Sequence, residues 1–236
     1  MEPILLYGFP AGSSLGLVMA LEWLGLPHRL SRVDMMGPMQ QPSYGRINPR
    51  HETPVLVTED GRVLTETMAI AGWLEARDPD RRISFDPASP EADRAHQLAA
   101  FINTGFTGAF SPLWVAMEDP SLDENQLAVL REFGHKRVRN RHDRLEEMIG
   151  DTPFLVGDRP SIADGILIGV ARWLDFHKVG DRSEWPKLDA VRRRIEADPA
   201  YAYALAIEEG ETPAGSGACL GQVPLDEVIE RFGTPA

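Results

Sequence analysis

Two short segments combine polar side chains with the expected start of a helix. Ser13 and Ser14 follow a short apolar run that ends at Tyr7, and an amphipathic stripe begins directly after them. Glu66 and Thr67 stand in the same position before a second stripe. Because the first N–H groups of a helix are unpaired and its dipole is positive there, both places favour an anion. On the residues alone, an ordinary helix start is the favoured interpretation, since caps use the same side chains.

The elements around these segments alternate between strand and helix. Apolar periodicity and turn residues predict a strand at 3–7, a helix ending at Gly25, a strand at 28–34, a hairpin over 54–65 and a helix at 66–77. The Asp60-Gly61 pair supplies the hairpin turn. The first 78 residues therefore predict a small α/β domain with a mixed sheet of four strands.

From residue 91 onward the apolar period is that of a helix. Helices are predicted at 91–117, 124–149, 161–177, 187–197 and 200–209. The chain is thus expected to divide into an α/β domain at 1–78, a linker at 79–90, an all-helical domain at 91–209 and a tail at 210–236. The tail is rich in Gly and Pro, and one last short helix is predicted at 225–232.

Composition and charge exclude several classes of protein. With 24 Lys and Arg against 36 Asp and Glu, the formal charge is −12, which disfavours nucleic acid and anionic membranes as partners. One cysteine, Cys219, excludes an internal disulfide framework, and the six histidines show no metal spacing, so no metal is expected. No apolar run approaches the ~20 residues of a membrane span. Met1-Glu2-Pro3 lacks a basic secretion signal, so a cytoplasmic protein is expected.

Three motifs occur in order along the chain. They are Asn-Pro-Arg-His-Glu-Thr-Pro-Val-Leu at 48–56, Leu-Thr-Glu-Thr-Met-Ala-Ile at 64–70, and Phe-Leu-Val-Gly-Asp-Arg-Pro-Ser-Ile-Ala-Asp at 154–164. Together with the order of elements, they resemble the cytosolic glutathione transferases over residues 3 to about 200. The resemblance implies a thioredoxin-like domain that binds glutathione, an α-helical domain that holds the second substrate, and a homodimer. Ser161 and Asp164, three residues apart before an apolar run, are interpreted as a capping box that starts a helix.

The resemblance also implies a glutathione site. Pro54 would be cis, so that the main chain of Thr53 pairs with the cysteinyl part of glutathione as an added strand. Thr67 and the helix start would bind the γ-glutamyl carboxylate, with Glu66 meeting the α-ammonium. The aligned position for the glycyl carboxylate carries Glu52, which would repel it. Candidates to replace that contact are Arg50, His51 and the glutamines of 39–41, Gln41 among them.

A transferase of this kind must hold glutathione as a thiolate, because the thiolate is the nucleophile. Three hydroxyls could stabilise it, in the order Ser13, Ser14 and Tyr7. The pattern Leu-Tyr-Gly-Phe-Pro-Ala-Gly-Ser-Ser-Leu resembles the beta-like bacterial members, with Ser13 at the place of their cysteine, while theta- and zeta-like members carry serine near this position. Serine cannot form a mixed disulfide with glutathione, so thiol transfer through an enzyme cysteine is not expected.

The second substrate is expected to be an apolar electrophile or a peroxide. Gly105, Phe106 and Thr107 replace the polar residues that commonly follow Thr104 in the beta class, which suggests a pocket lined by Phe106, Phe110 and Trp114. The same aromatics also fit a plain core. Two alternatives to a transferase stay open: a glutathione-dependent isomerase or lyase of the zeta-like kind, and a non-catalytic member that uses the fold as a binding module, which Glu52 favours.

Overall fold

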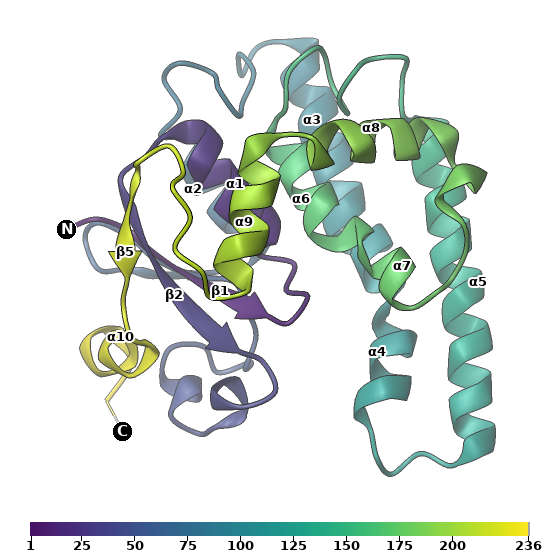
Figure 1. The fold of residues 1–236 in the computed structure, drawn as a ribbon, viewed down its shortest axis with the longest axis horizontal. Coiled ribbons are helices and arrows are strands. Elements are labelled where there is room, and N and C mark those ends of the chain that lie inside the picture. Colours follow the sequence, from purple (N-terminus) through teal and green to yellow (C-terminus); the bar gives the residue numbers. More distant parts are fainter. Residues whose placement is uncertain (236) are drawn as a thin grey trace.

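The computed structural model describes residues 1–235 and shows a five-stranded sheet joined to a helical domain (Figure 1). The strands are β1 (Ile4–Phe9), β2 (His28–Asp34), β3 (Val55–Val57), β4 (Val63–Thr65) and β5 (Cys219–Gln222). Their order across the sheet is β4-β3-β1-β2-β5. β1 and β2 are parallel, whereas β3 runs antiparallel to β1 and forms a hairpin with β4. The mixed sheet and the predicted hairpin are confirmed.

Helices α1 (Leu15–Leu24) and α2 (Thr67–Glu75) complete the first unit. α1 is apolar over most of its surface and is buried against the sheet and the helical domain. It ends at Gly25, whose φ of 65° is the left-handed conformation that glycine adopts without a steric penalty. The predicted helix end at Gly25 is therefore confirmed.

The fifth strand corrects the expectation of four. β5 comes from the tail and pairs in parallel with β2, so that the end of the chain returns to the first unit (Figure 1). The helix predicted at 225–232 is present as α10 (Leu225–Phe232), which buries Val228 and Ile229 under the other face of the sheet. Cys-Leu-Gly-Gln carries no strand signal of its own. It forms a strand through its pairing with the free edge of β2, which local propensity does not indicate.

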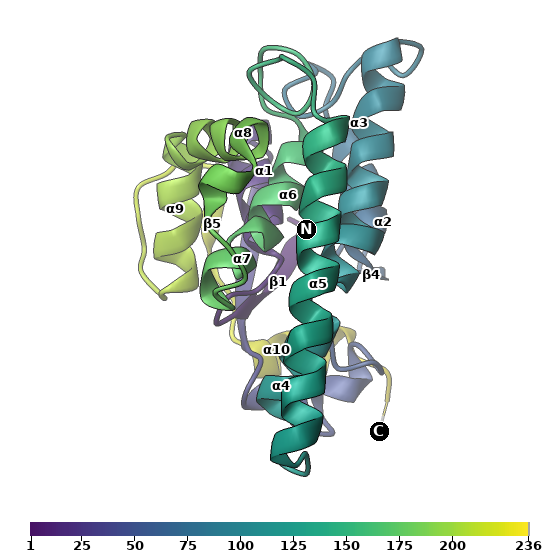
Figure 2. The same ribbon diagram turned by 90° about the vertical axis from the view of Figure 1, so that its right-hand side faces the viewer.

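The second unit consists of helices alone between residues 90 and 208. Its helices are α3 (Pro90–Phe101), α4 (Ser111–Glu118), α5 (Glu124–Met148), α6 (Ile162–Ala171), α7 (Trp173–Phe176), α8 (Pro186–Glu196) and α9 (Pro199–Glu208). Figure 2 shows α5 running the length of this unit, with α4 packed against its first half. Within the described residues, no helix combines the length and apolar character that a membrane span requires.

The single helix predicted at 91–117 is interrupted. Residues Ile102–Phe106 form a turn of π-helix between α3 and α4, and a short bend follows before α4 begins. Gly105 and Gly108 lower the helix propensity here, and Pro112 lies in the first turn of α4, where its missing N–H costs nothing. The apolar period continues through the interruption, which is why the sequence pattern suggested one helix.

The two units meet where α6 and α9 pack against α1. A Cβ atom at Gly16 would lie 1.7 Å from the Gly165 carbonyl oxygen, and one at Gly169 would lie 2.2 Å from the Ser13 carbonyl oxygen. Only glycine allows the helices to approach this closely. The predicted capping box at the start of α6 is confirmed: Asp164 Oδ2 accepts hydrogen bonds from Ser161 N at 2.9 Å and Ser161 Oγ at 2.7 Å. The fold therefore brings α6 directly against the segment that carries Ser13.

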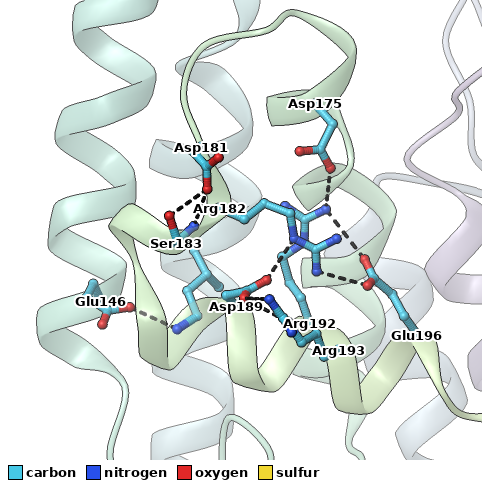
Figure 3. Close-up of polar contacts among 10 residues, drawn as sticks. Glu146, Asp175, Asp181, Arg182, Ser183, Asp189, Arg192, Arg193 and Glu196 are labelled. Atoms are coloured by element: carbon cyan, nitrogen blue, oxygen red, sulfur yellow. Dashed lines mark hydrogen bonds and ion pairs between the residues drawn. The ribbon is translucent and has the colours of Figure 1, made fainter.

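A cluster of ion pairs holds α7 and α8 together (Figure 3). It comprises Asp175, Arg182, Asp189, Arg192, Arg193 and Glu196 and is here called the Arg192 cluster. Arg192 is 2% exposed and donates to Asp175 Oδ2 at 2.8 Å. All of its members belong to the helical unit.

Candidate functional site

The loop between β1 and α1 is held by side chains from the helical unit. Ala11 N donates to Glu208 Oε1 at 2.9 Å, and Trp173 Nε1 donates to the Ala11 carbonyl at 2.8 Å. Arg172 donates to the Gly12 carbonyl at 2.8 Å and to Glu208 Oε2 at 2.6 Å. Arg172 and Glu208 with these loop contacts are here called the Glu208 cluster. It fixes the loop immediately before Ser13.

A cavity of about 220 Å³ opens beside this loop, between the two units. Its walls from the first unit include Ser13, His51, Glu52 and Thr53, and from the helical unit they include Trp114, Glu118 and Trp173. Ser13, predicted to meet the sulfur of glutathione, and Thr53, predicted to pair with its cysteinyl main chain, therefore line one cavity.

The three predicted hydroxyls differ in what they contact. Ser13 lines the cavity, and its Oγ makes no hydrogen bond within residues 1–235. Ser14 is 1% exposed, and its Oγ accepts a hydrogen bond from Gly8 N at 2.9 Å. Tyr7 is 2% exposed and donates to the Ile207 carbonyl at 3.0 Å. Ser14 and Tyr7 are thus engaged inside the fold.

Burial has a second consequence for Tyr7. It raises the pKa of the Tyr7 phenol to about 12, against a smaller opposing effect of the hydrogen bond from Gln222. The hydroxyl lies between the sheet and α9 rather than at the cavity. Tyr7 is not among the residues that line the cavity, so it stays the last of the three predicted candidates for the thiol.

The Thr53–Pro54 peptide is cis, as the resemblance implied. A Cβ atom at Gly8 would lie 2.3 Å from Thr53 Oγ1, so Thr53 stands directly beside the end of β1. Thr53 immediately precedes β3 and lines the cavity. Its main chain is therefore placed where an extended peptide could add to the sheet.

Glu66 and Thr67 lie at the start of α2, outside the lining of the cavity but linked to its Glu52 through Arg50, an exposed group of side chains here called the rim. The first helical hydrogen bond runs from Ile70 N to the Glu66 carbonyl at 3.0 Å, so the N–H groups of the first turn have no acceptor within the helix. Glu66 has a φ of 75°, a left-handed conformation that is uncommon for a residue with a side chain. Such conformations cluster at ligand sites.

Arg50 joins the two acidic residues of this rim. It donates to Glu52 Oε2 at 2.9 Å and to Glu66 Oε1 at 2.5 Å. All three side chains are about half exposed, so the ion pairs themselves add little stability. Arg50 nevertheless offsets the charge of Glu52, which the sequence alone suggested would repel a carboxylate.

Of the residues predicted to meet the glycyl end of glutathione, His51 lies at the cavity and Gln41 does not. His51 lines the cavity, and its Nδ1 lies 2.7 Å from the Met39 carbonyl, which can only accept. Nδ1 therefore carries the proton and leaves Nε2 as the other polar atom of the ring. Gln41 lies instead in a separate groove against α10, whereas its neighbour Gln40 lines the apolar cavity described next. Neither glutamine lines the cavity that contains Ser13 and Thr53, so a role for Gln41 in binding glutathione stays a prediction.

A second cavity of about 430 Å³ adjoins the first and shares Ala11, Met35, Met39, Trp114 and Glu118 with it. Met36 and Met117 add two more thioethers, and the ring of Phe176 stacks on Trp114 with centroids 5.3 Å apart. Flexible, polarisable methionines adapt to varied apolar ligands. The lining residues of both cavities include no Lys or Arg.

Two of the three predicted pocket aromatics lie elsewhere. Phe106 and Phe110 are each 0% exposed, and both pack against His142 in the core of the helical unit. The prediction that they line the pocket is therefore corrected, and only Trp114 of the three lies at the cavities. The interruption after α3 turns both phenylalanines inward, a change of direction that apolar periodicity does not encode.

Sequence reasoning missed Arg172, Trp173 and Glu208 as residues of the site. Their contacts with the loop cross 160 to 197 positions of sequence, and no local motif marks them. Met35, Met36 and Met39 lie in the loop after β2, where the sequence shows no apolar periodicity. Their frequency in that loop was the one local signal of an apolar cavity wall.

Comparison with known proteins identifies the family. Residues 13–77 match the model of the glutathione S-transferase N-terminal domain, and residues 128–194 match that of the C-terminal domain. A solved glutathione transferase from Methylococcus capsulatus strain Bath is 31% identical, with a TM-score of 0.71 over 88% of this chain and 98% of that one. The chain belongs to the glutathione S-transferase family.

Curated relatives agree with this membership. Glutathione S-transferase GST-4.5 of Xanthomonas campestris pv. campestris is 29% identical over 86% of this chain and 98% of its own. Maleylacetoacetate isomerase of Pseudomonas aeruginosa is 27% identical over 86% of this chain and 95% of its own. This family member thus resembles both a transferase and an isomerase at similar identity.

Proposed function

We propose that this glutathione S-transferase family member conjugates glutathione to a neutral, apolar electrophile. The observation that carries the proposal is the position of Ser13, which lines one cavity together with Thr53 and the aromatic side chains of the helical unit and has no hydrogen bond to its hydroxyl within residues 1–235. We also expect a homodimer, as in the family, which a measurement of molar mass in solution checks.

In the proposed mechanism Ser13 stabilises the glutathione thiolate. A free thiol has a pKa of about 8.5, so at neutral pH it is mostly protonated. The Ser13 hydroxyl donates a hydrogen bond to the thiolate, and the N-terminal end of α1 adds a favourable dipole. Both interactions favour the charged form, which lowers the pKa of the bound thiol and raises the fraction of nucleophile.

The rest of glutathione would be held by the first unit. The Thr53 main chain pairs with the cysteinyl segment, and the start of α2 binds the γ-glutamyl carboxylate through Thr67. Glu66 receives the α-ammonium group, and His51 with Arg50 faces the glycyl end. Because Arg50 contacts Glu52, it reduces the repulsion that this carboxylate exerts on the glycyl carboxylate of glutathione.

The electrophile would occupy the methionine-rich cavity. Its lining is mostly apolar, and Glu118 is its one charged side chain. An anionic substrate would meet repulsion from Glu118 with no cation among the lining residues to offset it. The cavity therefore favours a neutral apolar or aromatic electrophile, which the thioethers and the Trp114–Phe176 pair contact.

The two adjacent serines provide the experiment. Ser13→Ala is expected to lower turnover with glutathione and an aryl halide by about 10²-fold, since one donor to the developing charge is removed, while glutathione affinity changes little. Ser14→Ala is the matched control. It leaves Gly8 N without its acceptor and should cost about 1–3 kcal/mol of stability, yet keep turnover per folded molecule. Equal turnover in Ser13→Ala and wild type would remove Ser13 from the mechanism.

A second candidate is a glutathione-dependent isomerase. The similarity to a maleylacetoacetate isomerase favours it, whereas the acidic cavity does not suit a carboxylate substrate. An isomerase returns free glutathione, so glutathione consumption separates the two. Product formation from a keto-acid substrate without loss of thiol would replace the transferase proposal.

A further inference from the structure

The first residue of β5 is the sole cysteine, and it lies on the far side of β2 from the proposed glutathione site. Cys219 is partly exposed at an edge strand and is not in a disulfide. Its Cα partner on β2 is His28, which is 0% exposed. The cysteine side chain packs against the layer of α1 and α9.

A contact with the backbone fixes the imidazole ring of His28. Its Nδ1 lies 2.8 Å from the Leu26 carbonyl, which can only accept, so Nδ1 carries the proton. The unprotonated Nε2 is buried and has no hydrogen-bond partner within residues 1–235. A buried imidazole nitrogen without a partner is costly, and the group beside it is the thiol of Cys219.

Two further unpaired polar atoms gather at the same place. Tyr203 OH on α9 and Glu22 Oε1 on α1 are also buried without hydrogen-bond partners in the described chain. A second oxygen of Glu22 accepts from Ser216 N at 2.7 Å, which ties the segment before β5 to this group. Four elements thus converge on one thiol with a base, a hydroxyl and a carboxylate, although the proposed transferase mechanism uses none of them.

The environment favours the thiolate. Burial alone raises the pKa of Cys219, but the polar groups of His28, the Gly221 backbone and Tyr203 beside the thiol together lower its pKa below the ordinary value. A thiol with a lowered pKa and partial exposure is the form that attacks disulfides.

We propose that Cys219 is a modification site that forms a mixed disulfide with small disulfides of the glutathione disulfide class. His28 Nε2 accepts the thiol proton, and Sγ attacks one sulfur of the disulfide. The Sγ–S bond forms as the old S–S bond breaks, and the departing thiolate takes up the proton. The disulfide is the oxidant, and the step is reversed by a dithiol. It does not depend on thiol activation by Ser13.

The test uses the full chain, glutathione disulfide and intact-protein mass spectrometry at pH 7. One glutathionyl adduct is expected, absent in Cys219→Ser and removed by a dithiol. His28→Gln should form it about tenfold more slowly, because the base is lost. His96→Gln is the matched control, since His96 is an exposed histidine paired with Glu75 elsewhere, and it should react like the wild type. No adduct, or equal rates in His28→Gln and wild type, overturns the proposal.

A second measurement tests the proposal without the His28→Gln variant, in case that variant does not fold. The rate of Cys219 alkylation by a neutral reagent is followed against pH in the wild type, with Cys219→Ser as the blank. The proposal expects half of the maximal rate at a pH below the ordinary thiol value of about 8.5. A midpoint at or above that value overturns it.

Discussion

Two charge clusters of this molecule, each with a mostly buried arginine, use similar side chains but contact different partners. In the Glu208 cluster, the pair of Arg172 and Glu208 also bonds the backbone of the loop before Ser13. In the Arg192 cluster, arginines and carboxylates bond one another between α7 and α8 (Figure 3). The first cluster crosses the boundary between the units, whereas the second stays within the helical unit. A buried ion pair therefore affects chemistry only where it also holds a reacting segment.

The largest effect is expected from breaking the Glu208 cluster. Glu208→Ala leaves Arg172 buried without its carboxylate and frees Ala11 N, which should cost about 3–5 kcal/mol of stability. The released loop displaces Ser13, so turnover should fall by about 10²-fold. Steady-state kinetics and urea unfolding measure the two effects. Full turnover in the folded variant would show that the clamp does not position Ser13.

The stability of the helical unit, which contains the Arg192 cluster, is expected to fall in acid. Burial lowers the pKa of His142 to about 4 from 6.5, with a smaller effect of Arg192 in the same direction. Because the unfolded chain binds the proton more readily, stability is lost as the pH falls from about 6.5 to about 4. The loss should reach about 3 kcal/mol, and His142→Phe should remove that part of the pH dependence. Parallel pH profiles of the two proteins would contradict this assignment.

Breaking the Arg192 cluster should change stability and leave activity in place. Arg192→Met removes the buried cation from Asp175 and Glu196, both of which retain some access to water, so we expect a loss of about 1–3 kcal/mol. Turnover per folded molecule should equal that of the wild type. Arg144→Gln breaks an exposed pair with Glu147 as a control and should cost under about 0.5 kcal/mol. Lost turnover in folded Arg192→Met would end the distinction between the clusters.

The smallest effect on stability is expected at the exposed rim. Arg50→Gln breaks two solvent-exposed ion pairs, with a cost of under about 1 kcal/mol. Glu52 then keeps its full charge where the glycyl carboxylate is proposed to bind, and glutathione should bind about threefold to tenfold more weakly. Calorimetric titration measures the affinity. Unchanged binding would place the carboxylates of glutathione away from this rim.

The sequence predicted the parts of the molecule that local chemistry determines. Alternation and turn residues gave β2 its bounds at His28 and Asp34, and the spacing of Ser161 and Asp164 predicted a helix start that the structure confirms. A one-residue distinction such as Ser13 against Ser14 depends on which hydroxyl meets Gly8 N, a contact that only the folded loop determines. Glu208 and β5 act through partners far away in sequence, so no periodicity indicates them.

The pairing of β5 with β2 also determines when the sheet can be completed during synthesis. β2 is synthesised early, whereas its outer partner follows the entire helical unit in the chain. Until residues 219–222 have left the ribosome, the edge of β2 carries unpaired N–H and C=O groups that another nascent chain could join. Closure by so distant a segment is slow compared with local helix formation. The end of the chain thus covers the edge of a sheet whose first strand lies within the first ten residues. Deleting this end would leave the edge of β2 exposed and prone to aggregation, so the shortened protein would not stay intact.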